Sequence, residues 1–402
     1  MIESVSIMKK KVVFMIINMN IGGTEKALLN MIAEMPENEY EITILMLENY
    51  GGFLDSIPNT VHVEYVQEYP ALKDMLNNPP RTTMIDLFKK GRLVKSLGFT
   101  ITTLLSKILK NKGIFFKYIL KNVPKFKKEY DIAVAYAGPM DFISYFVVHK
   151  IKARKKIQWI HFDVTKIGFD VNFAANNYKN FERIFVVSEE AKSKLVSLVP
   201  VIEEKSGIFL NLVSPNLIRT KSKEGNGFND GFKGIRILTV GRLTTEKGQD
   251  LAIRALSKLI DDGYDVKWYC LGEGSSRSEY EDLIKKFKLQ DRFILLGSDP
   301  NPYTYMDQCD IYVQPSRYEG YCITLIEARC LAKPIVTTKV NGAKEQIENG
   351  ETGIIVSIDE DKIYDAVKEL IQNPKICQEF KIKLSKETFK IKNEIDKFYK
   401  VI

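Results

Sequence analysis

The amino-acid sequence predicts an α/β protein made of two successive doubly wound domains, each a mostly parallel sheet covered by helices. The chain has 402 residues, which is too long for one ordinary hydrophobic core and suits two domains. Short apolar runs alternate with helix-length segments along the whole sequence, as expected when helices cover both faces of such a sheet. Apolar residues make up 45% and charged residues 27% of the chain, which favours a globular protein over a disordered or membrane-spanning one.

Twelve short apolar runs are the predicted strands, six in each half of the chain. Those of the first half are residues 12–17, 42–46, 61–65, 132–136, 157–160 and 183–187. Those of the second half are residues 235–240, 266–271, 293–296, 311–314, 334–337 and 353–356. The first run follows lysines as in a signal peptide, but it is short and no small-residue cleavage site follows, so we predict a buried strand. No other stretch is long and uncharged enough to cross a bilayer.

The cysteine and histidine content argues against a zinc site. The five cysteines are an odd number without metal-type spacing, and free thiols of a cytoplasmic protein are the simplest interpretation. They are Cys270, Cys309, Cys322, Cys330 and Cys377. The three histidines, His62, His149 and His161, stand far apart, so none is at ligand spacing from another.

Composition also suggests the domain boundaries. Residues 222–234 read SKEGNGFNDGFKG, a stretch rich in glycine, asparagine and charge that we predict as a linker or hinge surface. We expect a first domain over residues 1–212 and a second over residues 213–385. Residues 386–402 are expected to form a C-terminal helix that could pack back on the first domain.

Residues 71–130, expected as a helical insertion in the first domain, are strongly basic. The segment holds 14 lysine and arginine residues against three acidic ones, an excess of 11 that is larger than the formal charge of +8 of the whole chain. Leucine, isoleucine and phenylalanine are interleaved with these charges, a composition typical of helices that lie on an anionic membrane surface. The alternative is a helical pair that caps the sheet of the first domain with solvated lysines. A nucleic-acid partner ranks below both, because no recognised binding motif is present.

Three places in the sequence have the residues of a phosphate and sugar site. After the first predicted strand, adjacent glycines let the backbone turn tightly, and the helix that follows offers free N–H groups to an anion. After residues 235–240, Arg242 and Lys247 could hold a diphosphate and stabilise it as it leaves. Farther along, Glu319 and Glu327 could accept hydrogen bonds from sugar and ribose hydroxyls. Each place by itself also fits an ordinary turn or surface charge.

With these motifs in this order, the sequence resembles the retaining glycosyltransferases of family 4, which have the GT-B fold of two Rossmann-like domains facing a central cleft. The resemblance covers most of the chain and is densest after residue 235. Its motifs are Gly22-Gly23-Thr24-Glu25, Gly241-Arg242, Glu246-Lys247-Gly248, Gly272-Glu273-Gly274, the pair Glu319 and Glu327, and Asn341-Gly342-Ala343-Lys344-Glu345. Asn301-Pro302-Tyr303 ahead of Cys309-Asp310-Ile311 further suggests the capsule and exopolysaccharide branch.

The resemblance implies roles for these residues. Donor binding would fall to the second domain, through Gly241, Arg242, Lys247, Tyr321, Cys322, Ile323 and Glu327. In that set, Arg242 and Lys247 would hold the diphosphate and Glu327 the ribose hydroxyls. The catalytic positions would be Glu319, on the hydroxyls of the donor sugar, and His161, which stands just past a strand of the first domain where the family has an active-site histidine. Tyr321 and Cys322 depart from the family, which more often has phenylalanine and a small residue there.

The implied reaction transfers a sugar with retention from a nucleotide diphosphate donor, with a UDP-sugar favoured, to a glycan, lipid-linked or other cell-surface polysaccharide acceptor. Acceptor binding would fall to the first domain, with Gly22, Gly23 and Glu25 in its acceptor or phosphate loop. The leaving diphosphate would deprotonate the incoming hydroxyl, so no enzyme nucleophile is required. The Asp-x-Asp at residues 359–361 opens a predicted helix and is expected to cap it, so we expect metal-independent activity without a cofactor.

Two other functions stay open on the sequence. A nucleotide-sugar epimerase of the same fold would convert the donor sugar with no acceptor present, so product analysis separates it from a transferase. A non-catalytic nucleotide-sugar-binding subunit would show no turnover. For the transferase we expect a cytoplasmic location, peripheral on the inner face of the cell membrane, and no nucleic-acid partner.

Overall fold

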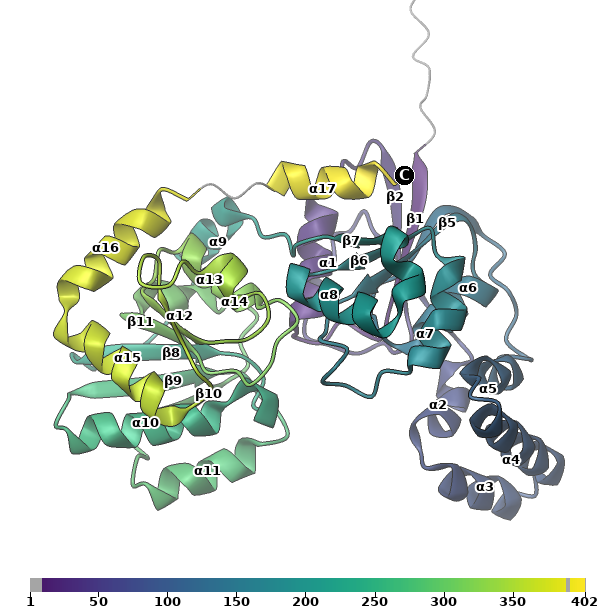
Figure 1. Cartoon of the computed structure of the whole chain (residues 1–402), viewed down its shortest axis with the longest axis horizontal. Coiled ribbons are helices and arrows are strands. Elements are labelled where there is room, and N and C mark those ends of the chain that lie inside the picture. Colours follow the sequence, from purple (N-terminus) through teal and green to yellow (C-terminus); the bar gives the residue numbers. More distant parts are fainter. Residues whose placement is uncertain (1–8, 388–390, 402) are drawn as a thin grey trace, which may run out of the picture. The chain divides into compact units, whose positions relative to one another are not determined.

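The structure is a computed structural model that describes residues 9–387 and 391–401, and this part of the chain forms two compact units (Figure 1). Unit 1 comprises residues 9–20, 32–209 and 397–401. Unit 2 comprises residues 21–31 and 210–396. The first part of helix α1 (Gly23–Ala33) therefore clusters with the second half of the chain, although it directly follows the first strand.

Unit 1 is built on a seven-stranded parallel sheet with the order β3-β2-β1-β4-β5-β6-β7. Its strands are β1 (Lys10–Ile16), β2 (Tyr40–Met46), β3 (His62–Tyr65), β4 (Glu129–Ala135), β5 (Lys152–Ile160), β6 (Arg183–Val186) and β7 (Ser206–Ile208). The six predicted strands of the first half are all present. The sequence does not predict β7, because a serine, a glycine and one isoleucine make no apolar run.

Helices and aromatic side chains cover the two faces of this sheet. Helices α6 (Asp141–Lys150), α7 (Val171–Asn177) and α8 (Glu189–Leu198) contribute to the main core on one face. On the other face, Phe398 packs against Phe14 and Trp159, with ring centroids 6.1 and 6.3 Å apart. Phe398 belongs to α17 (Ile391–Tyr399), within the predicted C-terminal segment 386–402. Residues 388–390 and 402 of that segment lie outside the described residues.

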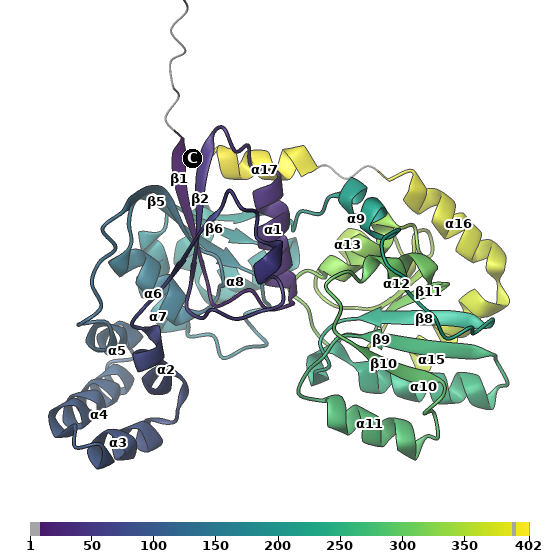
Figure 2. The same ribbon diagram turned by 180° about the vertical axis from the view of Figure 1, so that it is seen from behind.

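Four helices between β3 and β4 form a lobe of their own at one end of unit 1 (Figure 2). They are α2 (Tyr69–Asn77), α3 (Pro80–Lys89), α4 (Leu93–Ile108) and α5 (Lys112–Ile119). Phe116 of α5 joins this lobe to the rest of the unit, because its ring packs against Phe142 of α6 and Phe173 of α7 at centroid distances of 5.9 and 5.6 Å. The basic segment thus forms four helices, not the pair considered from the sequence.

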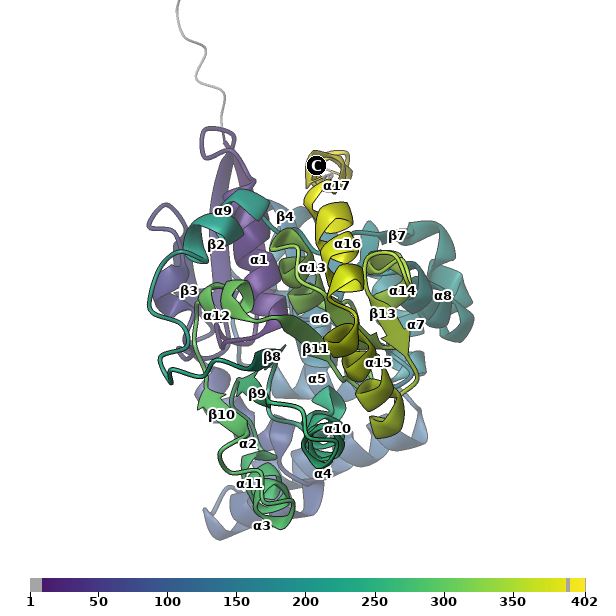
Figure 3. The ribbon, with the colours of Figure 1, turned by 90° about the vertical axis from the view of Figure 1, so that its left-hand side faces the viewer.

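Unit 2 is built on a six-stranded parallel sheet with the order β10-β9-β8-β11-β12-β13. Its strands are β8 (Ile235–Val240), β9 (Val266–Leu271), β10 (Phe293–Gly297), β11 (Ile311–Gln314), β12 (Ile335–Thr338) and β13 (Ile354–Val356). All six were predicted from the sequence. Helices α10 (Gln249–Asp261), α11 (Arg277–Lys286) and α15 (Glu360–Gln372) form the core with one face. Helices α9 (Pro215–Lys221), α12 (Tyr303–Gln308) and α13 (Ile323–Cys330) lie on the other (Figure 3).

The predicted linker at residues 222–234 is wrong, because this segment is an integral part of unit 2. Asp230 accepts hydrogen bonds from Arg236 at 3.1 Å and from the hydroxyl of Tyr269 at 2.5 Å. The ring of Phe228 packs on Tyr269, with centroids 4.3 Å apart. One aspartate and one phenylalanine therefore fix a segment whose composition is typical of a linker, and the chain passes between the units at Phe209 and Leu210 instead.

Three smaller predictions concern the cap of α15, the cysteines and the possibility of a membrane-spanning helix. Asp359 caps α15 as expected, since its carboxylate accepts from the backbone N–H groups of Asp361 and Lys362 at 2.8 and 3.1 Å. The five cysteines are free, as predicted, and all but Cys377 are buried. Within residues 9–387 and 391–401, no helix combines the length and the apolar character that crossing a bilayer requires.

Candidate functional site

The predicted donor residues meet at the carboxyl end of the sheet in unit 2. Strands β8 and β11 are neighbours there, and the strand order reverses between them. Gly241 and Arg242 directly follow β8, and the loop that carries Glu319 follows β11. In doubly wound folds, ligands bind where the strand order reverses, outside the carboxyl ends of the strands. The topology therefore gathers motifs that are nearly 80 residues apart in the sequence.

Glu319 and Lys247 form a tightly paired centre in this region. The Lys247 Nζ lies 2.7 Å from each carboxylate oxygen of Glu319, and the two side chains are 19% and 9% exposed. Burial lowers the pKa of Lys247, but the charge of Glu319, the hydrogen bond to it and the nearby Cys322 together outweigh burial, so the pKa is raised and the amine stays protonated. Because Lys247 neutralises Glu319 in this structure, an incoming phosphate would compete with the carboxylate for the amine.

A chain of buried hydrogen bonds runs from the end of β11 to Glu319 and orients its carboxylate. Gln314, the last residue of β11, donates to Ser316 Oγ at 2.9 Å, and Ser316 donates to Glu319 Oε1 at 2.7 Å. The hydroxyls of Tyr312 and Thr324 both donate to Gln314 Oε1, at 2.6 and 3.0 Å. Such a satisfied buried network fixes the position of the carboxylate at its end.

The loop that holds Arg242 and Lys247 is fastened to the loop after β11. Arg317, in the loop after β11, makes a bidentate ion pair with Asp250, which lies in the first turn of α10 directly after the Lys247 loop, at 2.7 and 2.6 Å. Gly248 has a φ of +70°, and a Cβ there would come within 2.1 Å of the Pro315 carbonyl oxygen. A side chain at this position would therefore push the two loops apart. Arg242 itself is 53% exposed, and its guanidinium contacts Glu246 at 3.3 Å, so much of it is open to a ligand.

Glu327 is the most deeply buried charge of the predicted site. It lies on α13 with 0% of its side chain exposed, and its Oε1 accepts from Lys26 Nζ at 2.6 Å and from the Tyr303 hydroxyl at 3.1 Å. Lys26 also lies 4.4 Å from the centre of the Tyr303 ring. The second oxygen, Oε2, is buried and has no hydrogen-bond partner among the described residues. A buried carboxylate oxygen without a partner is costly, so this atom is suited to accept a hydrogen bond from a ligand.

The backbone that precedes Glu327 presents a helix N-terminus. Cys322 is the N-cap residue of α13, and Ile323 begins the helix. The first N–H groups of a helix have no partner within it and attract anions. Burial raises the pKa of the Cys322 thiol to about 12, so this cysteine is neutral near pH 7. Tyr321 is also buried, and its carbonyl accepts a long hydrogen bond from Asn211 at 3.5 Å.

The glycine turn at residues 22–25 lies with these residues in unit 2. A Cβ on Gly23 would be 3.8 Å from Ile323 Cδ1, and one on Gly22 would be 2.5 Å from the carboxylate of Glu25, which folds back over the turn. Burial raises the pKa of Glu25 to about 7, against the opposing effects of its own backbone N–H and of the Arg242 charge. Glu25 is therefore a partly protonated acid at neutral pH.

His161 lies in unit 1, directly after β5. The imidazole is packed beside Tyr136, with centroids 4.6 Å apart, and its Nε2 is buried without a hydrogen-bond partner among the described residues. Burial lowers the pKa of His161 to about 3, although a hydrogen bond to the backbone of Tyr136 opposes this. The ring is thus neutral near pH 7 and has one nitrogen available to a ligand.

Several site residues were missed in the sequence, and only some carried a signal. Gln314 and Ser316 follow a predicted strand, so their place at its carboxyl end could have marked them. Lys26 and Tyr303 meet Glu327 from two other helices, and no sequence pattern brings these three together. Among residues 9–387 and 391–401, no three His, Cys, Asp or Glu side chains are grouped as ligands of a metal ion.

Known glycosyltransferases resemble the part of the chain that holds most of these residues. Residues 219–386 match the family model of "Glycosyl transferases group 1". The N-acetylgalactosamine-N,N'-diacetylbacillosaminyl-diphospho-undecaprenol 4-alpha-N-acetylgalactosaminyltransferase of Campylobacter jejuni is 31% identical over 228 residues, which are 53% of this chain and 60% of that protein. The capsular polysaccharide biosynthesis glycosyltransferase CapM of Staphylococcus aureus is 27% identical over 201 residues, 47% of this chain and 52% of that protein. The chain thus spans about half the length of the first curated relatives it matches.

The fold can be compared over its full length. The crystal structure of Anabaena Alr3699/HepE in complex with UDP-glucose aligns with a TM-score of 0.69 over 98% of this chain and 100% of that one, at 16% sequence identity. The chain accordingly has the predicted GT-B fold of two Rossmann-like units. Residues 219 to 386 are thus similar to the group 1 glycosyltransferases, which supports the predicted enzyme class.

Proposed function

We propose that this protein transfers a sugar from a nucleotide diphosphate donor, with a UDP-sugar favoured, to a glycan or lipid-linked acceptor. The observation that carries the proposal is Glu327 Oε2, a fully buried carboxylate oxygen without a partner among the described residues. It lies in the unit that also supplies two cations and a helix N-terminus for a diphosphate. A carboxylate beside a diphosphate site is what a nucleotide ribose requires.

Each part of a nucleotide sugar has a candidate partner in unit 2. Glu327 Oε2 would accept from a ribose hydroxyl. Arg242 and Lys247, with Gly241 and the N–H groups of Tyr321, Cys322 and Ile323, would hold the diphosphate. Glu319 would accept from the sugar hydroxyls once Lys247 turns to the phosphate. The ion pair of Lys247 and Glu319 would then be exchanged for two ligand contacts, so neither charge would be left unpaired.

We further propose a retaining reaction that needs no enzyme nucleophile. The leaving diphosphate oxygen takes the proton of the acceptor hydroxyl as the bond from the sugar carbon to that oxygen breaks and the bond to the acceptor oxygen forms. Arg242 and Lys247 offset the negative charge that develops on the diphosphate. A neutral Cys322 thiol is a poor nucleophile, which supports this route. His161, neutral and with a free Nε2, is proposed to contact the donor sugar or the acceptor.

The Campylobacter relative is named for a diphospho-undecaprenol acceptor and the Staphylococcus relative for capsular polysaccharide biosynthesis. We therefore propose a lipid-linked or capsule-type acceptor for this chain, bound by unit 1, and we keep Gly22, Gly23 and Glu25 as the proposed acceptor or phosphate loop. The location would be peripheral, on the inner face of the cell membrane. An epimerase is not favoured, because the matching family and relatives are named as transferases.

The test is a hydrolysis screen. The protein is incubated with a panel of UDP-, GDP- and ADP-sugars without acceptor, and release of the nucleoside diphosphate is measured together with the sugar recovered. We expect slow release of the nucleoside diphosphate from one nucleotide sugar of the panel, and we expect that nucleotide sugar to be a UDP-sugar. Conversion of the donor to an epimer, or no release from any donor in the panel, would contradict the proposal.

A further inference from the structure

Helix α4, in the four-helix lobe of unit 1, carries its apolar side chains on the outside. Seven of them are between 42% and 88% exposed; they are Leu93, Val94, Leu97, Ile101, Leu104, Leu105 and Ile108, called the α4 apolar face below. At 100° of rotation per residue they fall within about 120° of the helix circumference. They are therefore one continuous stripe, not scattered surface residues.

The opposite side of α4 is the more polar one, although it faces the protein. Its buried residues are Ser96, Phe99 and Ser106. Ser96 donates to the carbonyl of Met84 at 3.1 Å, which satisfies its hydroxyl inside the lobe. A helix on a water-soluble lobe normally buries its apolar stripe. In α4 the apolar side chains face outward instead. An exposed apolar surface of this kind is typical of a site that contacts a membrane or another protein.

Exposed lysines lie on α4 and in the segment that follows it. Lys107, Lys110 and Lys117 are exposed, and none has an acidic partner among the described residues. Lys112 differs, because it forms ion pairs with Asp141 at 2.6 Å and Asp170 at 3.4 Å that join the lobe to its neighbours. These exposed lysines of the four-helix lobe are therefore available to an anionic partner.

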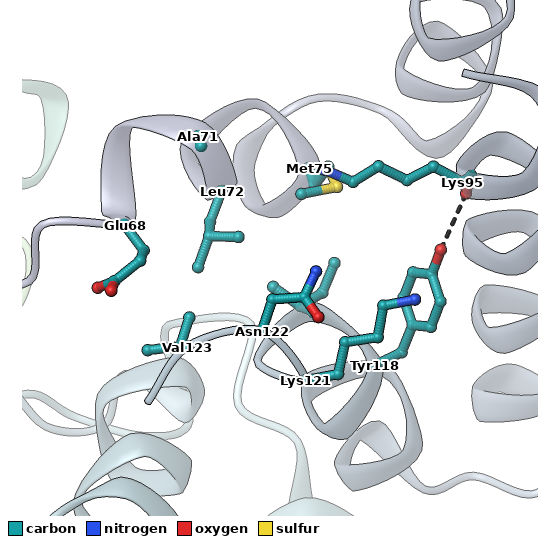
Figure 4. A pocket seen from close by; sticks show the side chains of 10 residues that line it. Glu68, Ala71, Leu72, Met75, Lys95, Tyr118, Lys121, Asn122 and Val123 are labelled. Carbon is teal, nitrogen blue, oxygen red and sulfur yellow. Dashed lines mark hydrogen bonds between the residues drawn. The ribbon is translucent and has the colours of Figure 1, made fainter. Parts of the chain in front are cut away.

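A pocket next to this helix has two lysines and one glutamate, Glu68, in its lining. It has a volume of about 180 Å³ and lies between α2, α4 and α5 (Figure 4). Leu72, Met75 and Val123 give it an apolar lining, and Lys95 and Lys121 line its other side. Burial, together with the charges of Arg92 and Lys121, lowers the pKa of Lys95.

We propose that the α4 apolar face docks the protein on an anionic lipid membrane, where its leucines and isoleucines enter the bilayer interface and the exposed lysines of the lobe contact lipid phosphates. The helix has 16 residues, about 24 Å in length, and lies in the interface plane without spanning it. A second copy of this chain fits the face poorly, because a symmetric dimer would bring the two sets of unpaired lysines together. Delivery of a membrane-bound acceptor to unit 1 rests on the proposed function, whereas docking itself does not.

The test is co-sedimentation with vesicles of phosphatidylcholine, alone or mixed with phosphatidylglycerol. The wild type should bind the mixed vesicles and lose binding as salt is raised. The variant Leu97→Ser/Ile101→Ser/Leu104→Ser should bind at least about tenfold more weakly, because three apolar side chains no longer enter the interface. The matched control Val201→Ser/Leu217→Ser/Ile382→Ser changes residues that are 42% to 67% exposed elsewhere and should bind like the wild type.

A second variant separates charge from apolar contact. Lys107→Gln/Lys110→Gln/Lys117→Gln leaves the structural Lys112 in place and should reduce the preference for anionic vesicles at least about fivefold. Unchanged binding of the serine variant, equal binding of the wild type to both vesicle types, or no binding would overturn the proposal. So would a dimer without vesicles that only the α4 serine variant abolishes, since it would assign the face to a second copy. Donor hydrolysis is read without vesicles on the same proteins, so a failure of the proposed function is seen separately.

Discussion

Replacing Glu327 by alanine tests the donor site at its most buried charge. The substitution removes the acceptor Oε2 and also the partner of Lys26 and Tyr303. A hydrogen bond to a charged group contributes about 1.5 to 3 kcal/mol. At about 1.4 kcal/mol per factor of ten, loss of one ribose contact should lower kcat/KM for the donor about tenfold to 150-fold.

The same substitution affects stability, and the two effects can be measured apart. Breaking a fully buried ion pair costs about 3 to 5 kcal/mol. Lys26 is 16% exposed and can turn towards water, so we expect a loss of about 2 kcal/mol. Urea unfolding measures this loss, and donor kinetics are taken where the variant is folded. The matched control is Glu369→Ala, an exposed glutamate on α15 of the same unit. A folded Glu327→Ala protein with the donor kinetics of the control would refute our placement of the ribose.

Three further outcomes follow from the same site. Arg242→Ala should weaken donor use by about 1.5 to 3 kcal/mol without lowering the unfolding midpoint, because its guanidinium is half exposed; unchanged donor kinetics would count against its role. Activity should survive EDTA, since cations and helix N-termini meet the diphosphate charge; complete loss that magnesium or manganese restores would contradict this. The pKa of Glu25 is raised from 4.5 to about 7, so folding stability should fall as pH rises between these values, by about 1 to 2 kcal/mol after allowance for partial exposure. Glu25→Gln should remove this fall in urea unfolding, and an identical pH dependence in the variant would sink the argument.

The sheets of both units were predictable because their strands are buried on both faces. Such strands read as continuous apolar runs, and Val12, Ile157 and Val266 mark strands that the structure contains. The family resemblance implied that Arg242 and Glu319 serve one donor site, and β8 and β11 bring both residues to one edge of the sheet. Local sequence patterns were therefore sufficient to predict the strands of both sheets.

Contacts across the fold could not be predicted in this way. The linker prediction failed because Asp230 and Phe228 find partners on β9 that no local composition reveals. The partnership of Lys26 with Glu327 joins positions 301 residues apart. The outward orientation of the α4 leucines was also hidden, since a periodic pattern shows that a helix has an apolar stripe but not which way the stripe faces.

The most direct test of the account is sugar transfer itself. The purified protein is incubated with the UDP-sugar that it hydrolyses and with undecaprenyl-diphosphate-linked saccharides, and the lipid products are followed by mass spectrometry and by the anomeric coupling in NMR spectra. We predict an acceptor heavier by one sugar, joined in the anomeric configuration that the sugar had in the donor. A donor that is epimerised or merely bound, with no sugar added to any lipid-linked or capsule-type acceptor, would contradict the assignment of this chain as a glycosyltransferase.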